Sequence, residues 1–511
     1  MTDSPQLPAP VLCGSYASLG EALAAAASQF GSREAYVDGG ERISFAEWNR
    51  QADAVAGELA ARGVVRGDVV ALMLPSGAAY AVAYAAVVRL GAVVTGLNTR
   101  LGPRETRAVL DRCRPVLVIR DEEGGLPGVT QPVLSAKALN TARHTDARPR
   151  ALPGLTRADP AVIIWTSGTT GTPKGAWYDH AGLEAAVWTS GVMSAPFDRK
   201  LVATPFAHAG YMAKVWDQLA WGTTLVIGRV PWRAAEMAEI LGTERITVAG
   251  GVPTQWTKLL ELPDSARAPW PHLRLGISAT APAAPELVRR VNRALGVPLV
   301  VRYAMTESPS ISGTEPVDPP EVQFRTVGRP QSGVEVLVVD EEERPLPAGE
   351  TGAVRVRGTA VMRGYWRDPE RTADALDDGG WLRTGDVGRF TEEGNLVLTG
   401  RSSDVYIRGG YNVHPLEVEN VLSEHPELAR VAVVGSAAPV IGEIGVVFAV
   451  PADPRRPPGL AELREFCRRQ LADYKAPDRL ELVDALPLTS MLKIDRRALR
   501  DLAAKLPPQR R

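Results

Sequence analysis

The stretch IIWTSGTTGTPKGAWYDH, residues 163–180, opens with an apolar run that is followed by glycines, small hydroxyl residues and one lysine. The apolar residues from Ala161 to Trp165 predict a short buried strand, and the small polar residues that follow cannot continue it without leaving backbone groups unpaired. A loop therefore begins near Thr166. Its glycines let backbone N–H groups approach a ligand closely, its hydroxyls donate hydrogen bonds, and Lys174 adds a positive charge. These groups together suit phosphate oxygens.

The spacing of this loop differs from that of the Walker phosphate loop, which needs Gly, four residues and then Gly-Lys-Ser/Thr. Here Lys174 follows Gly171 after two residues and precedes Gly175. The sequence therefore predicts a different kind of phosphate loop. The alternative is an ordinary turn rich in glycine and threonine, which is the better interpretation of a lone segment of this kind, so other segments must decide.

Helical and strand patterns alternate along the first part of the chain. The expected strands are residues 68–74, 92–97, 223–228, 246–251, 273–278 and 298–305, and the expected helices are 45–63, 78–91, 232–242, 253–261 and 284–295. This βα alternation predicts the α/β class with a largely parallel sheet.

The pattern changes near residue 327 to short strands with Gly and Pro turns, which predicts a β subdomain. Mixed patterning then resumes, with helices expected at 415–424 and 459–472 and strands at 430–434, 445–450 and 479–487. We place a boundary near residues 399–404. The chain is thus expected to have a large N-terminal domain, residues 1–400, and a small α+β C-terminal domain, residues 401–511, of ordinary domain size.

The composition favours a globular protein that acts on small molecules. Lys+Arg 58 against Asp+Glu 59 gives a net charge of -1, which argues against a nucleic acid or an anionic membrane surface as partner. The cysteines Cys13, Cys113 and Cys467 stand apart without metal-site spacing, which fits a reducing cytoplasm. The N-terminus lacks the pattern of a secretory signal, and Arg89 and Gly91 interrupt the longest apolar stretch, so no membrane span is expected.

Six further segments follow the opening loop in a fixed order. They are PFAHAG (205–210), ISATAP (277–282), RYAMTES (302–308), WLRTGD (381–386), GRSSDVYIRGGYNVHPLEVE (400–419) and LPLTSMLKID (486–495). Together they resemble the ANL superfamily of adenylate-forming enzymes, which includes acyl-CoA synthetases, peptide adenylation domains and luciferases. One such motif is weak evidence, but six in the same order make coincidence very improbable.

The resemblance implies a mobile C-terminal domain and a reaction in two steps. A carboxylic acid attacks the ATP α-phosphate to give acyl-AMP and pyrophosphate, and a thiol, expected to be that of coenzyme A, then displaces AMP. Two anions must meet in the first step, so cations and donors must neutralise the charge that grows around the phosphorus. The implied ligands are ATP, Mg²⁺ and coenzyme A, and the implied partners are a small-molecule acid and, as an alternative acceptor, a separate acyl-carrier protein.

The same resemblance assigns residues to the nucleotide. The residues implied to surround the β- and γ-phosphates are Thr166, Ser167, Gly168, Thr169, Thr170, Gly171 and Lys174. Glu307 is the magnesium ligand, a hard oxygen donor, and Thr306 contacts the α-phosphate. The adenine walls are Tyr303 and the segment Ala279, Thr280 and Ala281, and the ribose falls to Asp386 and Arg401. Without the other motifs, Glu307 would be a solvated loop end, and Asp386 with Arg401 a surface ion pair.

Three further sites serve the two half-reactions in the family. Lys493 is implied to bridge the carboxylate and the α-phosphate during adenylation only, although a lysine near a chain end is otherwise a solvated side chain. His208 matches the gate between the acyl pocket and the thiol tunnel, and its alternative is a hydrogen-bonded structural histidine. The loop of Arg408, Gly409 and Gly410 is implied to face the active site in the thioester step, where glycines leave room for a pantetheine arm.

The sequence departs from the family pattern at several positions. Leu492 replaces the glycine before the lysine, Ala304 replaces the glycine of YGMTE, and Ala279 and Thr280 replace paired glycines. The hinge position, commonly acidic or lysine, is Ser403; rotation should survive because a hinge needs accessible backbone angles. Each of the other changes narrows or stiffens the expected site.

The segment after His208 predicts one helix, with Gly210, Lys214 and Asp217 or Gln218 on the same face. In related aryl-CoA ligases the equivalent turns line the acyl pocket, where Lys214 would need an anionic or polar partner on the substrate. The alternative is an intrahelical pair of Lys214 with Asp217. A long fatty chain is disfavoured by either arrangement.

Three functions remain open on the sequence. The first is an acid–CoA ligase acting on a small or medium carboxylic acid, aromatic acids included. The second is a stand-alone adenylating enzyme of natural-product biosynthesis that passes its adenylate to a carrier-protein thiol or an amine, or activates nitrite for N–N bond formation. The third is a nucleotide-binding homologue without turnover, for which Leu492 is the best argument.

Overall fold

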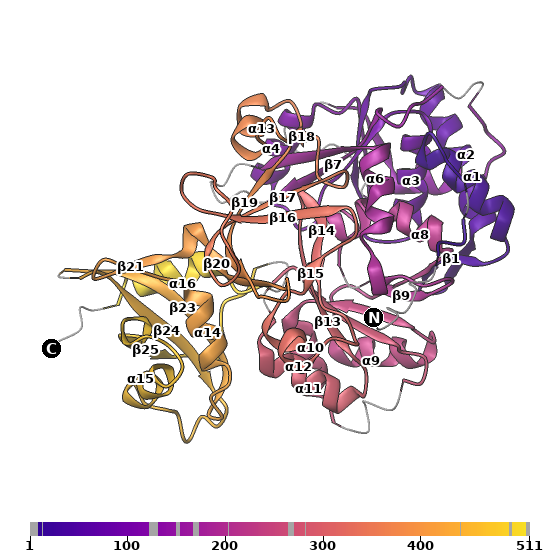
Figure 1. Cartoon of the computed structure of the whole chain (residues 1–511). Coiled ribbons are helices and arrows are strands. Elements are labelled where there is room, and N and C mark those ends of the chain that lie inside the picture. The colour runs from indigo at the N-terminus through magenta and orange to yellow at the C-terminus, as the bar shows by residue number, and fades with distance from the viewer. Residues whose placement is uncertain are drawn as a thin grey trace.

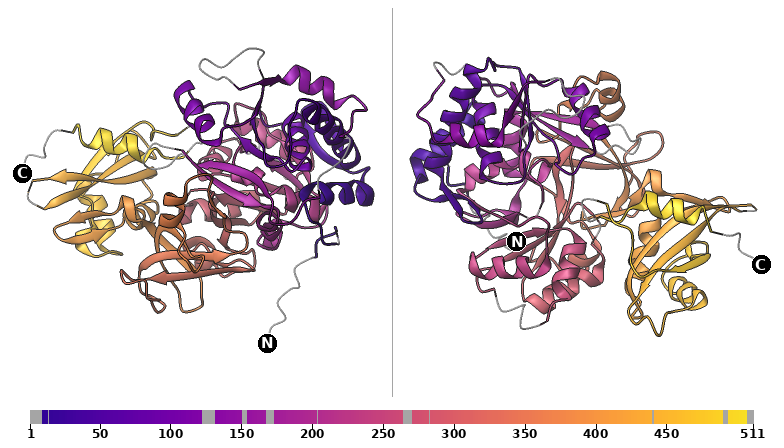
Figure 2. Two further views of the ribbon diagram at one scale, coloured as in Figure 1. Left: turned by 90° about the horizontal axis from the view of Figure 1, so that it is seen from above. Right: turned by 180° about the vertical axis from the view of Figure 1, so that it is seen from behind.

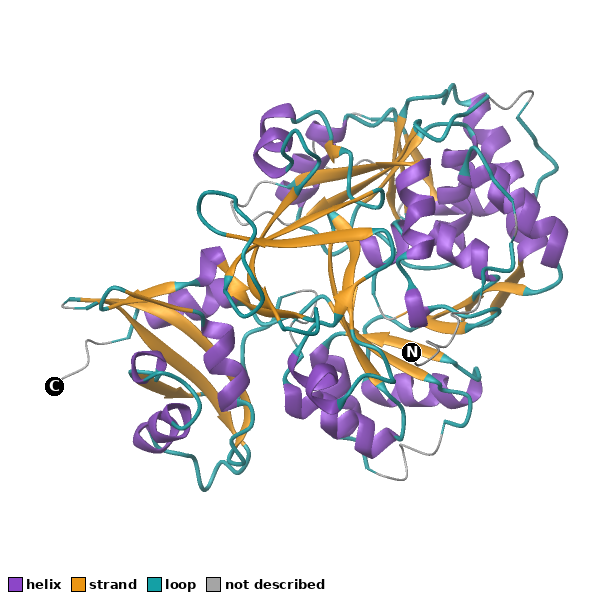
Figure 3. Cartoon of the chain, viewed as in Figure 1, coloured by secondary structure: helices purple, strands orange, loops and turns teal. Residues whose placement is uncertain are grey.

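The computed structural model divides the chain into a large N-terminal part and a small C-terminal part, which lies at one side in orange and yellow (Figure 1). Figure 2 shows the same division from two further directions, and Figure 3 shows helices flanking the sheets of the large part. The structure describes residues 9–12, 14–121, 131–149, 154–166, 173–202, 204–263, 270–281, 283–439, 441–489 and 493–506. This arrangement confirms the predicted fold class.

The opening stretch lies in a seven-stranded sheet. In spatial order its strands are β18 (Gly364–Tyr365), β8 (Lys174–Asp179), β7 (Pro160–Thr166), β4 (Val93–Gly96), β3 (Val69–Met73), β5 (Leu117–Arg120) and β6 (Val133–Ser135). The strands from β7 to β6 are parallel, whereas β8 runs antiparallel to β7. Residues Ala161 to Ile164 of β7 are fully buried, as the apolar run predicts. The loop predicted to bind phosphate therefore lies in the chain between β7 and an antiparallel neighbour, β8.

The second sheet has nine strands. In spatial order they are β15 (Arg329–Pro330), β14 (Ser308–Gly313), β13 (Leu299–Met305), β12 (Leu275–Ala279), β11 (Val248–Gly251), β9 (Arg199–Val202), β10 (Thr224–Ile227), β1 (Glu34–Asp38) and β2 (Glu41–Ser44). The run from β13 to β1 is parallel, and the strands at both edges are antiparallel. The carboxyl ends of the parallel strands therefore meet at one edge.

Helices cover these sheets. They are α1 (Leu19–Phe30), α2 (Phe45–Ala61), α3 (Ala78–Arg89), α4 (Pro103–Cys113), α5 (Ala136–Arg143), α6 (His180–Trp188), η1 (Gly191–Met193), α7 (Ala209–Met212), α8 (Val215–Trp221), α9 (Ala234–Thr243), α10 (Pro253–Leu260), α11 (Pro285–Leu295), α12 (Pro320–Arg325) and α13 (Pro369–Ala375). The largest hydrophobic cluster contains residues of both sheets and of α1, α2, α3 and α8. Helix α2 begins with a capping box between Ser44 and Glu47, which satisfies its first N–H groups. One core thus fixes the two sheets relative to each other.

The β subdomain predicted after residue 327 is a four-stranded antiparallel sheet of β16 (Val334–Val339), β17 (Gly352–Gly358), β19 (Leu382–Phe390) and β20 (Leu396–Arg401). The C-terminal part follows through η3 (Ser402–Asp404). Its elements are β21 (Tyr406–Arg408), β22 (Tyr411–Val413), α14 (Pro415–Leu422), β23 (Leu428–Ala438), β24 (Gly442–Pro451), α15 (Leu460–Arg468), η4 (Asp473–Lys475), β25 (Arg479–Leu482) and α16 (Arg496–Ala503). The expected boundary at residue 400 thus falls at the end of β20.

Charged side chains join the two parts. Glu424 Oε1, just after α14, lies 3.0 Å from Arg325 Nη2 of α12 and 3.8 Å from Arg289 Nη1 of α11. A second contact joins Arg430 Nη2 to Glu261 Oε1 at 3.4 Å. We call these the bridging ion pairs, because they connect side chains of the C-terminal part to helices of the N-terminal part in this arrangement.

Candidate active site

The predicted site residues gather where the parallel strands end. Ala279 to Ala281 lie at and after the end of β12, and Tyr303 to Glu307 lie at and after the end of β13. Ligands of open α/β sheets bind outside the carboxyl ends of their strands. Ser167, Gly168, Thr169, Thr170 and Gly171 lie outside the described residues, but Thr166 and Lys174 at either end of the loop are paired in the β7–β8 ladder.

Lys174 and Glu307 come from different sheets and meet at Tyr365. The Lys174 Nζ atom lies 5.2 Å from the centroid of the Tyr365 ring, and the Tyr365 hydroxyl donates a hydrogen bond of 2.8 Å to Glu307 Oε1. Burial and the Glu307 carboxylate raise the pKa of Tyr365, so the phenol keeps its proton at neutral pH. The sequence analysis missed Tyr365. It comes from β18, which pairs with β8, and nothing in the sequence connects these two segments.

The backbone around Glu307 is held on two sides. The Tyr178 hydroxyl donates 2.6 Å to the carbonyl oxygen of Thr306, and the Met362 N–H donates 2.9 Å to that of Glu307. A magnesium ion in a nucleotide site takes one or two carboxylates besides phosphate oxygens and waters. The buried Glu307 carboxylate, which accepts from the same Tyr365 that Lys174 approaches, fits such an ion. Within the described ranges no cluster of three or more His, Cys, Asp or Glu side chains forms a protein-only metal cage.

Asp386 and Arg401, predicted for the ribose, face each other in the β19–β20 ladder. Arg401 Nε donates to Asp386 Oδ1 at 3.1 Å, and the Tyr303 hydroxyl donates to Oδ2. Burial raises the pKa of Asp386, and the Arg401 charge and the Tyr303 hydrogen bond oppose that shift. The structure therefore brings one predicted adenine residue, Tyr303, and both predicted ribose residues together at one carboxylate.

Thr280 has a left-handed backbone with φ 71°. This is one of the two positions where the sequence replaces the paired glycines of the family. A β-branched residue with positive φ is a true outlier, because its Cβ crowds the backbone, and such conformations collect at functional sites. The chain therefore keeps the glycine-like backbone here in spite of the substitution.

His208 precedes α7 and contacts Asn98. Asn98 Oδ1 accepts from the N–H of Arg100 at 3.0 Å, so its Nδ2 is the atom that donates to His208 Nε2 at 3.2 Å. This assigns the imidazole proton to Nδ1. Burial, followed by the positive charge of Lys493, lowers the pKa of His208 to about 4. The imidazole is therefore neutral at physiological pH. The sequence analysis missed Asn98, which follows β4 by two residues.

Lys493 of the C-terminal part affects the electrostatics of this site. Its charge lowers the pKa of His208, and its own pKa is lowered by burial and by the charge of Arg401. The backbone around Lys493 is tied to Thr489, whose N–H donates to the Lys493 carbonyl oxygen at 2.8 Å. Leu492 lies outside the described residues. A lysine far along the sequence is thus partly buried within electrostatic range of two predicted site residues.

The loop Arg408–Gly410 lies elsewhere in this arrangement. Arg408 forms a bidentate ion pair with Asp478. Its Nε donates to Asp478 Oδ2 at 2.8 Å and its Nη2 donates to Oδ1 at 2.7 Å. Figure 1 shows β21 at the end of the C-terminal part that points away from the N-terminal part. Gly409 and Gly410 both have positive φ, 59° and 87°, which explains the glycine pair. Ser403 lies in η3, between the β subdomain and β21.

The predicted single helix after His208 is wrong. The chain forms two short helices, α7 and α8, interrupted at Ala213 and Lys214. Gly210 is exposed at the start of α7. Asp217 does not form the expected contact with Lys214, because its carboxylate accepts from Lys200 Nζ at 3.1 Å and from Ser190 at 2.6 Å. Lys214 Nζ instead donates to the carbonyl oxygen of Ala186 at 3.3 Å.

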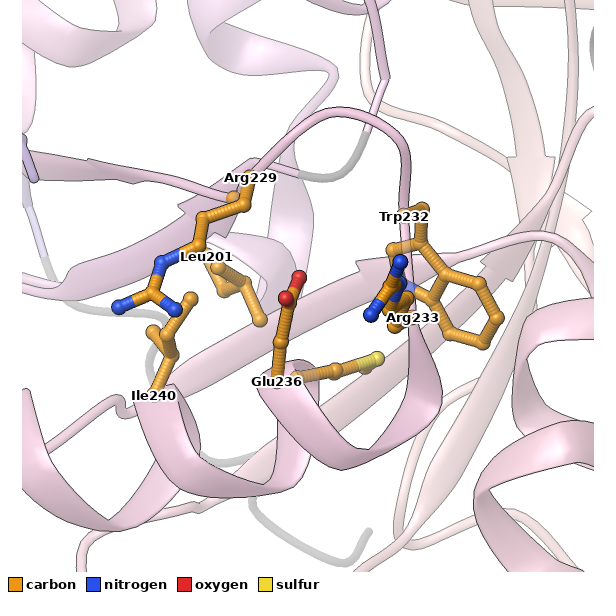
Figure 4. Close-up of a pocket in the computed structure, with 8 residues that line it drawn as sticks. Leu201, Arg229, Trp232, Arg233, Glu236 and Ile240 are labelled. Atoms are coloured by element: carbon orange, nitrogen blue, oxygen red, sulfur yellow. The ribbon is translucent and has the colours of Figure 1, made fainter.

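A separate hollow lies between α9 and the segment after β10 (Figure 4). Its lining includes Leu201, Arg229, Trp232, Arg233, Glu236 and Ile240, and its volume is about 10 Å³. That volume holds about one water molecule. It is too small for a substrate and lies apart from the residues described above.

Comparison with known proteins agrees with this arrangement. Residues 23–366 match the family described as AMP-binding enzyme, and residues 417–493 match the AMP-binding enzyme C-terminal domain. A feruloyl-CoA synthase of Amycolatopsis is 34% identical, over 89% of this chain and 93% of that protein.

Two solved structures share the whole fold. ATP-bound MatB from Rhodopseudomonas palustris superposes with a TM-score of 0.86 at 29% identity, over 95% of this chain and 99% of that one. The amide bond synthetase McbA from Marinactinospora thermotolerans gives 0.85 at 30% identity, over 95% and 100%.

The fold and the site define an AMP-forming acid–thiol ligase of the acyl-CoA synthetase type. The chain belongs to the AMP-binding enzyme family, and the predicted membership of the ANL superfamily is confirmed. Within the part of the chain that the structure describes, no helix combines the length and apolar character needed to cross a bilayer. Cys113 and Cys467 are buried free thiols.

Proposed function

We propose that this enzyme adenylates a small or medium carboxylic acid, aromatic acids included, and transfers the acyl group to coenzyme A. In the first half-reaction a carboxylate oxygen bonds to the α-phosphorus of ATP while the bond to the β-phosphate oxygen breaks and pyrophosphate leaves. In the second, the thiol sulfur bonds to the acyl carbon, AMP leaves, and the thiol proton passes to solvent.

The position of Lys493 carries this proposal. Adenylation brings two anions together, and a partly buried cation near Arg401 and His208 can stabilise the negative charge that develops. Because Lys493 belongs to the C-terminal part, its presence there depends on the relative position of the two parts. The arrangement supports an adenylation state in which Lys493 contacts the carboxylate and the α-phosphate.

The remaining site residues have matching proposed roles. Lys174, with the hydroxyls and N–H groups of the loop from Thr166, binds the β- and γ-phosphates. Glu307 would hold Mg²⁺, which neutralises phosphate charge when bound. Asp386 accepts hydrogen bonds from the ribose hydroxyls. Its fixed orientation supports this role, because one oxygen is already positioned by Tyr303 and the other by Arg401.

Thioester formation requires a second arrangement. Arg408, Gly409 and Gly410 lie away from the nucleotide residues here, and we propose that rotation about Ser403 brings this loop to the site. The bridging ion pairs oppose that rotation only weakly, since exposed pairs contribute about 0–1 kcal/mol each. His208, neutral and hydrogen-bonded to Asn98, is the proposed gate between acid and thiol.

Two observations limit the length and shape of the acid that we propose as substrate. Ala304 and Thr280 add side-chain atoms where the family has glycine, and the acyl-pocket segment is broken into α7 and α8, with Lys214 between them. These features favour a short or flat acid over a long chain. The similarity to a feruloyl-CoA synthase favours an aromatic acid. We propose a cytoplasmic enzyme, in keeping with its isolated cysteines.

The structural similarity to an amide bond synthetase favours a second candidate function, in which an amine or a carrier-protein thiol takes the acyl group. ATP–pyrophosphate exchange across a panel of short, branched and aromatic acids, with nitrite included, tests the first step. Addition of coenzyme A, a phosphopantetheinylated carrier or an amine then tests the acceptor. Exchange without thioester formation would reject the CoA ligase, and no exchange with any acid or with nitrite would favour a homologue without turnover.

A further inference from the structure

Arg302 stands directly before Tyr303 in β13, and successive strand residues point to opposite faces of a sheet. Tyr303 reaches Asp386 of the nucleotide site. Arg302 therefore points to the other face, which it shares with Val300. That face packs against Val192 of η1. A charged residue has thus been placed on an otherwise apolar face, one position away from the nucleotide residues.

No hydrogen bond reaches the guanidinium of Arg302 from any described residue. The side chain is 5% exposed, and its Nε, Nη1 and Nη2 atoms all lack a partner. Glu315 and Asp318 act on it only through their charge. Two glycines make room for it, because a Cβ atom at Gly313 would lie 2.0 Å from Nη1 and one at Gly191 would lie 3.6 Å from Nη2. A buried guanidinium without an anion is costly, so this one needs a partner.

Lys214 is a second cation without a carboxylate of its own. Its Nζ atom donates to the Ala186 carbonyl oxygen, at the end of α6 and just before η1. The nearby carboxylate of Asp217 is taken by Lys200 and two serines. Burial lowers the pKa of Lys214, the charge of Asp217 opposes that shift, and the charges of Lys200 and Arg302 add to it, so these charged groups lie in one electrostatic neighbourhood. Lys200 is thus paired with Asp217, whereas neither Arg302 nor Lys214 has a carboxylate within hydrogen-bond distance among the described residues.

A hollow borders the same face. A Cβ atom at Gly250 would meet nothing within 4 Å. Ile277, Ala279 and Ala304 are partly exposed although they lie in interior strands of the nine-stranded sheet. In the strand register, Gly250 lies beside Ile277, and Ala279 lies beside Arg302. Open space therefore lies beside Gly250, on the same face of the sheet as Arg302 and two strands away from it.

We propose that the acid substrate carries a second carboxylate, and that Arg302 and Lys214 bind it while the first carboxylate faces the α-phosphate. This inference rests on the proposed function. It adds a substrate class, the dicarboxylic acids, and two specificity-determining residues. The guanidinium is enclosed beside Gly313 and Gly191 in this arrangement, so we expect binding to include a rotation of the Arg302 side chain toward the open space at Gly250.

The test compares each diacid with its monoamide, which has nearly the same shape and one charge less. Benzene-1,3-dicarboxylate is paired with 3-carbamoylbenzoate, and glutarate with glutaramate, in ATP–pyrophosphate exchange by the wild-type enzyme. We expect kcat/KM to be at least about tenfold higher for the diacid of the better pair. Exchange with monocarboxylic acids but no preference for either diacid would overturn this inference and leave the proposed function standing. No exchange with any acid would overturn both.

Variants locate the second carboxylate. Arg302→Met and Lys214→Met should each remove most of the diacid preference and leave monoamide turnover within a few fold. Arg274→Met is the matched control, since Arg274, like Arg302, lies beside η1, where it donates to the Val192 carbonyl oxygen, but is ion-paired with Asp198; it should keep the preference. An equal loss for diacid and monoamide in Arg302→Met would assign Arg302 a structural role and overturn the proposal. If that variant does not fold, the wild-type comparison and Lys214→Met still decide.

Discussion

Asp386 and Arg401 lie opposite each other in the β19–β20 ladder, and Arg401 Nε donates to Asp386 Oδ1 at 3.1 Å. Arg401 is about half exposed, whereas the Asp386 carboxylate is almost fully buried. The pair is therefore more than a surface ion pair, because its acidic member is oriented by Tyr303 from the inside and by Arg401 from the outside. Arg401, the last residue of β20, thus orients a proposed ribose ligand, and the chain enters η3 immediately after it.

Asp386→Asn should weaken nucleotide binding. The amide keeps the shape of the carboxylate but loses the charge and one acceptor oxygen, so the KM for ATP in pyrophosphate exchange should rise about tenfold or more. Asp340→Asn is the control, since Asp340 pairs with Arg344 in an exposed turn. An unchanged KM in Asp386→Asn would remove this residue from the ribose site.

Lys493→Ala should separate the two half-reactions. Loss of the cation should lower the kcat of adenylation about a hundredfold or more, since one such electrostatic contact contributes about 2.7–4 kcal/mol in comparable sites. Thioester formation from supplied acyl-adenylate should stay within a few fold of wild type. Lys505→Ala, which removes an exposed lysine of the C-terminal part, should affect neither. Equal loss in both half-reactions would contradict the assignment.

The bridging ion pairs should favour the arrangement seen here. Glu424→Ala removes the contacts with Arg325 and Arg289, so the small part should leave the adenylation arrangement more readily. Exposed pairs are weak, and we expect a two- to fivefold fall in adenylation kcat with equal or faster thioester formation. Glu427→Ala is the comparison, since Glu427 lies three residues along and makes no ion pair with any residue that the structure describes. Slower thioester formation in Glu424→Ala would show that these pairs do not restrain the rotation.

Thr280 should be strained. Thr280→Gly relieves a left-handed backbone that costs about 1–3 kcal/mol for a residue other than glycine, and part of the gain is lost to the greater freedom of glycine in the unfolded chain. The free energy of unfolding should rise by about 1 kcal/mol. Thr243→Gly, at the last residue of α9, should instead lower the free energy of unfolding by about 0.3 kcal/mol, because glycine is a somewhat weaker helix former than threonine. A loss of stability in Thr280→Gly would show that its side chain has compensating contacts.

The sequence predicted the elements of the fold well because the periodicity of β3, α3, β10 and β13 is strong and local. The segment between Asp386 and Arg401 has the pattern of a hairpin, so the pairing of these two residues could be anticipated from the sequence. Tyr365 could not be found, because only the tertiary pairing of β18 with β8 brings it to Lys174. The break between α7 and α8 was also missed, since apolar spacing continues through it while the backbone does not.

Arg302 illustrates a different limit. In the sequence it is one arginine before a recognisable motif, and its significance depends on having no partner. Absence of a partner is a property of three-dimensional packing. The same holds for Asp217, whose expected interaction with Lys214 on a single helix gave way to Lys200 from a different element. Sequence spacing identifies which residues can contact each other on one helix or strand. It does not show which of them form ion pairs or hydrogen bonds with residues of other elements instead.

His208 and Lys493 should be coupled in their titration. Burial and the Lys493 charge lower the pKa of His208 to about 4 from an ordinary value near 6.5. The folded state therefore favours the neutral imidazole, and this contribution to stability is fully present above pH 6.5 and is lost as the pH falls toward 4. The shift corresponds to about 3 kcal/mol. His208→Phe should lose less stability than wild type over that range.

NMR titration of the histidine rings measures the same effect directly, and the chain has only 6 histidines to assign. We expect the His208 ring to stay neutral down to about pH 5. In Lys493→Ala the pKa of His208 should rise, because the repelling charge is gone, yet remain below its ordinary value, because burial is the larger cause. Lys505→Ala should leave it unchanged. If the His208 pKa is the same with and without Lys493, the lysine is not near the site in solution, and the adenylation arrangement is not the one that the free enzyme prefers.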